Sequence, residues 1–93
     1  LDNTPNRAKV ELGKMLFWDP ILSGEKDVAC ATCHHPKFGY SDGLNLSIGV
    51  GGDGLGKERK ELAGNRIPRV GRNSPTVINA AFNGLLNYHQ QYS

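Results

Sequence analysis

Residues 30–34 read Cys30-Ala-Thr-Cys33-His34 and contain both cysteines of this 93-residue chain. The spacing sets the two thiols about one helical turn apart, with an imidazole directly after the second thiol. Two thiols so placed can form thioethers with both vinyl groups of one porphyrin, while the imidazole of His34 gives a ring nitrogen to the iron. The pattern therefore predicts one covalently bound haem c, which would consume both thiols.

Two other interpretations of the same residues remain open. A disulfide between Cys30 and Cys33 would form a redox-active pair, although the strand–helix–strand context typical of such pairs is missing. A zinc ion could use Cys30, Cys33, His34 and His89, although structural zinc sites usually draw on a second clear pair of ligands.

The size and composition of the chain indicate one small domain, residues 1–93, that needs more than an ordinary apolar core. Hydrophobic residues make up 38% of the sequence and glycine occurs 12 times. A core of this size contributes only a few kcal/mol beyond the entropy cost of folding. A haem would add an apolar disc for the large apolar side chains to pack on: Leu12, Leu16, Phe17, Ile78 and Phe82.

Charge and hydropathy exclude two classes of partner. The formal net charge is only +2, with basic and acidic residues interleaved, which is no nucleic-acid footprint. No apolar run approaches the roughly 18 residues of a membrane span. Because haem c is generally attached outside the cytoplasm, we expect a periplasmic or otherwise exported protein.

Local signals predict helices on both sides of the haem motif. Thr4-Pro5 is typical of a helix start, with threonine as the cap and proline in the first turn. Asp19-Pro20 ends this helix, because the residue before proline avoids helical backbone angles. Asp27 could cap a short helix that carries the cysteines.

The second half of the chain is irregular, with one clear helical pattern near its end. Residues 57–63 could form a short exposed helix, and Ser74-Pro75 repeats the cap-then-proline signal. Apolar residues then follow helical spacing at Ile78, Ala81, Phe82 and Leu85. The fold class is therefore predicted as all-α: a loop-rich cytochrome c-like domain of about three short helices around one haem.

Five blocks of sequence occur in an order that resembles a known family. They are Glu11–Pro20, Leu22–Gly24, Phe38–Gly43, Ser47–Gly52 and Gly71–Asn83. This order resembles the N-terminal domain of the bacterial di-haem cytochrome c peroxidases and their MauG-like relatives, over most of residues 7–88. Residues 53–69 look like a loop insertion relative to the usual pattern.

The resemblance implies roles for individual residues. Cys30 and Cys33 match the thioether cysteines, and His34 matches the proximal ligand of the N-terminal haem. Asn73 matches an asparagine that contributes to a calcium site between the two domains. The family's second haem domain and its catalytic carboxylate correspond to sequence beyond Ser93, so no catalytic residue is assigned here.

Two positions depart from the family pattern. In many of these peroxidases a histidine after the Ser-Ile-Gly stretch closes the sixth position of this haem, and here that position is Val50. We therefore expect this ligand switch to be absent, as in the MauG-like branch. Tyr88 stands at the position of the tryptophan between the two haems, where it could relay electrons.

The sixth iron ligand separates two functional hypotheses. An open face would favour a haem domain or subunit of an exported di-haem peroxidase-type oxidoreductase that passes electrons to peroxide or a related oxidant. Ligation by Met15 or His89 would instead indicate a small mono-haem electron-transfer cytochrome. For the first hypothesis we expect a second haem domain or chain, or a second copy, on an exposed apolar face, together with a redox partner protein.

Other polar residues near the motif have less specific interpretations. His35 is expected to be a solvated neighbour of the proximal histidine. Three arginines, Arg66, Arg69 and Arg72, could neutralise haem propionates, dock an acidic partner or simply form a solvated loop face.

Overall fold

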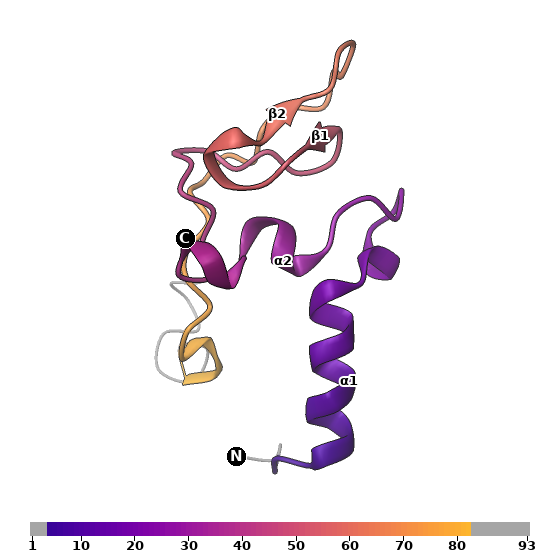
Figure 1. Cartoon of the computed structure of the whole chain (residues 1–93), viewed down its shortest axis with the longest axis vertical. Helices are drawn as coiled ribbons and strands as arrows, with labels where there is room; N and C mark the ends of the chain where they lie inside the picture. Colours follow the sequence, from indigo (N-terminus) through magenta and orange to yellow (C-terminus); the bar gives the residue numbers. More distant parts are fainter. Residues whose placement is uncertain (1–3, 83–93) are drawn as a thin grey trace.

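The computed structural model describes residues 4–82, which form a loop-rich chain arranged around one very short helix (Figure 1). This helix, α2, lies between the C-terminal end of α1 and the loops that carry a small sheet. The helices and strands are α1 (Arg7–Trp18), α2 (Cys30–Cys33), β1 (Gly52–Asp53) and β2 (Lys60–Glu61), with 3₁₀ turns at Pro20–Leu22, Pro36–Phe38 and Gly56–Glu58.

The first predicted helix is confirmed, with a different cap. Asn6 rather than Thr4 caps α1, because its side-chain oxygen accepts hydrogen bonds from the backbone N–H groups of Ala8 at 2.8 Å and Lys9 at 3.3 Å. The helix ends at Trp18, and the Asp19 side chain accepts from the Ile21 N–H at 2.9 Å as the next turn begins.

The short helix that carries the cysteines also begins without its predicted cap. Ala29 precedes α2, and its N–H donates to the hydroxyl of Thr32 at 3.0 Å. Asp27 lies two residues further back, where its carboxylate accepts from the Ser23 hydroxyl at 3.0 Å.

The all-α prediction is wrong in one respect, because the structure contains a two-stranded antiparallel sheet. Gly52 pairs with Glu61 and Asp53 pairs with Lys60. The helix predicted over 57–63 is replaced by a 3₁₀ turn followed by β2. Arg59 explains the difference, since its side chain turns inward to backbone carbonyls and its own backbone is extended.

The last predicted helix starts later than its sequence signal indicates. Ser74 does not cap a helix: it is buried, and residues 74–77 are irregular. Asn79 adopts a left-handed backbone with φ of 59°, and helical structure begins at residue 80. Leu85, the last residue of the predicted apolar pattern, lies outside the described residues.

The centre of the described chain is more polar than apolar. Within residues 4–82, the buried apolar side chains are Ala31 and Ile48, whereas the buried polar or charged side chains are Asp42, Ser47, Arg59 and Ser74. Three apolar side chains of α1, Val10, Leu12 and Met15, are more than half exposed. Hydrogen bonds among distant loops therefore carry much of the tertiary structure.

The end of α1 is joined to the residues after α2 by aromatic packing. Trp18 meets His35 edge to face, with ring centroids 5.4 Å apart, and Phe17 lies 6.2 Å from Tyr40. His35 is half-buried, and its Nδ1 accepts from the Lys37 N–H at 3.0 Å. It is therefore a packed residue, not the solvated neighbour that the sequence predicted.

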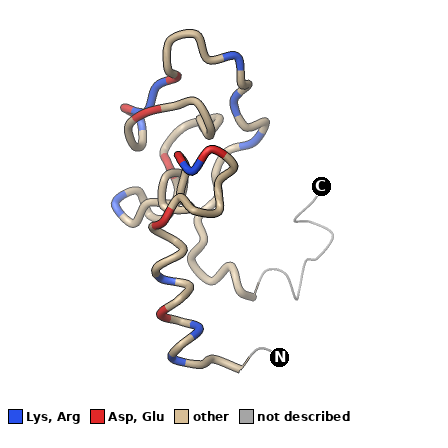
Figure 2. The backbone as a smooth tube through the Cα atoms, turned by 90° about the vertical axis from the view of Figure 1, so that its right-hand side faces the viewer, with Lys and Arg blue, Asp and Glu red and all other residues tan. Residues whose placement is uncertain are grey.

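Acidic and basic residues are interleaved over most of the described chain, whereas the last three charged residues, Arg66, Arg69 and Arg72, are all basic (Figure 2). Between residues 4 and 82, no helix has both the length and the apolar character needed to cross a membrane.

The two candidate caps of α1 can be separated by mutation. Asn6→Ala removes both cap hydrogen bonds, so we expect it to lower the free energy of unfolding by about 1 kcal/mol. Thr4→Ala is the matched control and should leave that free energy nearly unchanged. Urea unfolding followed by circular dichroism measures both, and an equal loss in the two variants would contradict the assignment of Asn6 as the cap.

Candidate functional site

The two thiols of α2 open onto one apolar groove. Cys30 is exposed and Cys33 half-buried, and both are free thiols. They line a groove of about 590 Å³ together with Val50, which the structure brings from a distant loop. The other lining residues are Asp19, Leu22, Ser23, Gly24, Val28, Ala29, Gly49, Ile67, Pro68 and Val70.

His34 directly follows α2 and has one ring nitrogen engaged by the protein. Its Nδ1 lies 3.0 Å from the carbonyl oxygen of Tyr40 and 3.3 Å from the hydroxyl of Ser74. A carbonyl can only accept a hydrogen bond, so Nδ1 is the protonated nitrogen. The lone pair of Nε2 is therefore available to a metal, with the ring orientation held by the Tyr40 carbonyl.

A strap of residues 74–76 holds the segment around His34 in place. The Ser74 hydroxyl donates to the Cys33 carbonyl at 2.8 Å, and the Thr76 hydroxyl donates to the Gly39 carbonyl at 2.7 Å. The Ser41 hydroxyl donates in turn to the Ser74 carbonyl. Sequence reasoning missed this role of Ser74, because Ser-Pro reads locally as a helix cap.

A second groove, of about 710 Å³, lies beside His34. Cys33 and Val70 line both grooves, so the two adjoin at the end of α2. Arg72 and Asn73 line the second groove, whereas Arg69 forms a salt bridge with Glu61 at 2.8 Å. Arg72 is thus the arginine of the three that the structure places beside the imidazole.

The electrostatic surroundings of Cys33 combine burial with two opposite charges. Burial raises the pKa of the Cys33 thiol above its ordinary value, the negative charge of Asp42 raises it further, and Arg59 acts in the lowering direction. Asp42 is 1% exposed; one carboxylate oxygen accepts from the Leu44 N–H at 3.0 Å, and the other has no protein partner within residues 4–82.

The remaining residues singled out from the sequence fall in different places. Val50 faces the thiol groove, as described above. Met15 is 62% exposed on α1 and lines neither groove at α2. The Asn73 side-chain nitrogen donates to the Leu44 carbonyl, which leaves the amide oxygen available to a cation. Tyr88 and His89 lie outside the described residues.

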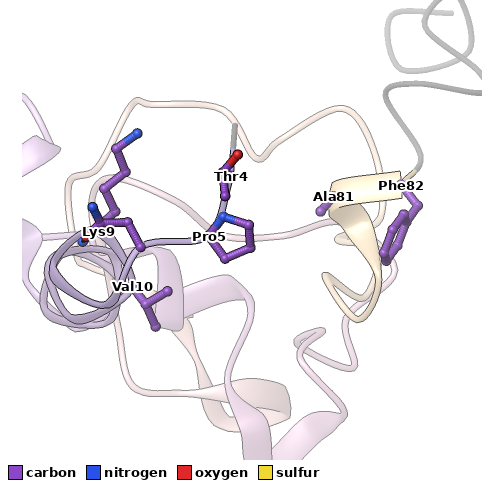
Figure 3. Close-up of a pocket in the computed structure, with 7 residues that line it drawn as sticks. Thr4, Pro5, Lys9, Val10, Ala81 and Phe82 are labelled. Atoms are coloured by element: carbon purple, nitrogen blue, oxygen red, sulfur yellow. The ribbon is translucent and has the colours of Figure 1, made fainter. Parts of the chain in front are cut away.

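A third groove is separate from the α2 site. It has a volume of about 510 Å³ and lies between the start of α1 and residues 81–82, where Val10 and Phe82 are exposed (Figure 3). It shares no lining residue with the two grooves at α2. This apolar surface is therefore a second feature of the molecule, distinct from the thiol and imidazole site.

The donor set at α2 fits a covalently bound haem better than a metal ion alone. Two free thiols face one apolar groove, and the next residue is an imidazole with a free Nε2. In the described part of the chain, no three His, Cys, Asp or Glu side chains come together in a way that could hold a metal ion. This finding gives no support to the zinc interpretation, whose fourth ligand, His89, lies outside the described residues.

Similarity to a known protein family extends over nearly the whole chain. A family model described as di-haem cytochrome c peroxidase matches residues 7–93. This chain belongs to the di-haem cytochrome c peroxidase family. The resemblance predicted from the sequence blocks is therefore confirmed, and the family implies a haem c cofactor.

Individual proteins similar to this chain support the same family assignment. Cytochrome-c peroxidase IdrP2 of Denitromonas iodatirespirans is 42% identical over 82 residues, which are 86% of this chain and 18% of that protein. The methylamine utilization protein MauG of Methylorubrum extorquens is 58% identical over 43 residues, 46% of this chain and 12% of that protein. Cytochrome c551 peroxidase of Pseudomonas aeruginosa is 40% identical over 73 residues, which are 78% of this chain and 17% of that protein.

The chain spans less than a fifth of the length of these curated relatives. No solved structure matches the chain significantly.

The raised pKa of Cys33 can be tested on the chain before haem attachment. Alkylation requires the thiolate, so a thiol with a raised pKa reacts only at higher pH. In a Cys30→Ala variant, we expect the pH midpoint for alkylation of Cys33 to lie above that of free cysteine in the same assay. A midpoint at or below that of free cysteine would contradict the burial of this thiol.

Proposed function

We propose that this chain carries one haem c, bound through thioethers at Cys30 and Cys33, with His34 as an axial ligand of the iron. One observation carries the proposal: both thiols line a single groove while the adjacent imidazole presents a free Nε2. The Tyr40 carbonyl and the Ser74 hydroxyl would keep the imidazole oriented toward the iron, as hydrogen-bonded partners of ligating histidines do.

The chain would serve as a haem-bearing part of an exported di-haem peroxidase-type oxidoreductase in the periplasm. Bound haem would supply an iron that exchanges electrons with peroxide or a related oxidant. The protein's contribution is an apolar wall of Gly49, Val50 and Val70 beside the thiols. Valine offers no ligand atom, so the iron face on the Val50 side would stay open to small molecules.

Two further contacts to the cofactor and to ions follow from the second groove. Arg72 lines it beside His34 and could neutralise a haem propionate. Asn73 could contribute its free amide oxygen to a calcium ion whose other ligands come from elsewhere. We also propose that residues 53–69, which carry the turn at Gly56–Glu58 and β2, are an insertion relative to the family pattern.

The partners follow from the relatives and from the exposed apolar surface. The relatives named as cytochrome c peroxidases are more than five times as long as the aligned segment. We propose that a second haem domain or chain, or a second copy, covers apolar residues of α1 and residue 82, and that a redox partner protein supplies electrons. Exposed apolar side chains such as Val10 and Phe82 support this proposal.

Covalent attachment is the first test. Expressed with a cytochrome c maturation system, the protein should have an intact mass equal to the polypeptide plus one haem. The Cys30→Ser and Cys33→Ser double variant should lose the covalent haem. A Ser23→Ala variant, which alters a residue of the same groove but no thiol, is the matched control and should keep it. A colourless wild-type protein at the polypeptide mass would contradict the proposed function.

A second test concerns the open face at Val50. Val50→His places an imidazole in the groove with both thiols, so we expect it to ligate the iron and convert high-spin ferric haem to a six-coordinate low-spin form. Val10→His on α1 adds the same side chain away from the site and should leave the spectrum unchanged. Absorption and electron paramagnetic resonance spectra decide, and a wild-type haem that is already low-spin would refute the open face.

A further inference from the structure

Arg59 is a buried arginine whose hydrogen bonds all go to backbone carbonyls of one loop. Its side chain donates from Nε to the Ile48 carbonyl at 2.6 Å, from Nη2 to Gly49 at 2.7 Å and from Nη1 to Gly54 at 3.0 Å. The residue is only 7% exposed. Five N–H groups in a rigid fork suit arginine to bind several carbonyls at once.

Backbone carbonyls of the loop, and not a carboxylate, compensate the buried charge of Arg59. Burying an ion is costly unless its donors are satisfied, and within residues 4–82 the guanidinium forms no salt bridge. The carbonyls therefore provide its compensation. Hydrogen bonds from a charged donor are stronger than neutral ones, so together they hold the loop firmly.

Gly52 shows how closely the backbone covers the guanidinium. A Cβ at this position would lie 2.5 Å from the Ile48 side chain and 3.0 Å from Nη2 of Arg59. The β1–β2 pairing and the hydrogen bond from the Leu62 N–H to the Gly51 carbonyl, at 2.8 Å, close the loop from the other side. The Ile48 side chain and, less closely, the Arg59 guanidinium thus leave no room for a Cβ at position 52.

The clamped loop is the one that presents Val50 to the thiol groove. Residue 50 directly follows two of the carbonyls that Arg59 binds and precedes the third. We propose that Arg59 is a positioning residue: it holds residues 48–54 so that Val50 faces Cys30 and Cys33 and thereby determines which ligands reach this side of the site. The proposal rests on the proposed haem function for its consequence, but not for the geometry of the clamp.

The test uses a histidine at position 50 as a reporter of loop position in the haem-loaded protein. In a Val50→His background we expect low-spin haem. Adding Arg59→Met, which removes all three carbonyl contacts, should return a substantial fraction to high spin. Adding Arg59→Lys, which keeps the charge with fewer donors, should have a smaller effect. Arg69→Met alters an exposed arginine of the same stretch and is the matched control, expected to stay low-spin.

Amide hydrogen exchange tests the same loop without relying on ligation of the haem iron. Amides of residues 48–54 should exchange about tenfold faster or more in Arg59→Met than in Arg69→Met, as expected for loss of charged hydrogen bonds. If Arg59→Met fails to fold, the same comparison is made with Arg59→Lys.

The outcomes separate this proposal from the proposed function. Unchanged exchange of residues 48–54 in the Arg59 variant, or a reporter that stays fully low-spin, would overturn the positioning role. A wild-type protein without covalent haem would overturn the proposed function, and the exchange result would still decide whether Arg59 holds the loop.

Discussion

Hydrogen bonds from buried polar side chains to backbone carbonyls hold the described part of this chain together around α2. Ser74 reaches the Cys33 carbonyl from 41 positions away, and Arg59 gathers carbonyls from both ends of the loop that contains Val50. Such bonds matter because the buried apolar side chains of residues 4–82 are only Ala31 and Ile48. A small domain that buries so little apolar surface depends for its stability on hydrogen bonds between distant segments or on a large cofactor.

This mode of construction explains why the site has two distinct sides. On one side, the strap at residues 74–76 and the Tyr40 carbonyl orient the His34 imidazole. On the other, the loop held by Arg59 sets Val50 against the thiols. Both sides are formed by loops, so their geometry depends on a few specific hydrogen bonds and not on helix packing.

Several elements were predictable because their signals are local. Helix α1 follows from apolar spacing and from Asp19-Pro20, which ends it near Trp18. The misplaced cap at Thr4 has a similar cause, since Thr4 and Asn6 are polar residues close together and either could satisfy the helix terminus. Asp27 is a different case: α2 begins after Ala29, and the Asp27 carboxylate binds the Ser23 hydroxyl instead. Arg59 and Ser74 were missed for a different reason. Arg59 stands in a stretch that is typical of a short exposed helix, and Ser74 in one that is typical of a helix start. Each finds its partners only when another segment folds back onto it.

The sequence by itself determined the donor atoms of the site and the family: two thiols and an imidazole within five residues, whose spacing is a property of one helical turn. Tertiary structure decided how those donors are presented. It selected the Tyr40 carbonyl for Nδ1 of His34, left Cys33 half-buried within reach of the charges of Asp42 and Arg59, and brought Val50 to the groove. The physical reason is that hydrogen bonds between segments far apart in the chain have no local sequence signature. Every backbone carbonyl can accept such a bond, and only the tertiary arrangement determines which carbonyl lies near a given donor.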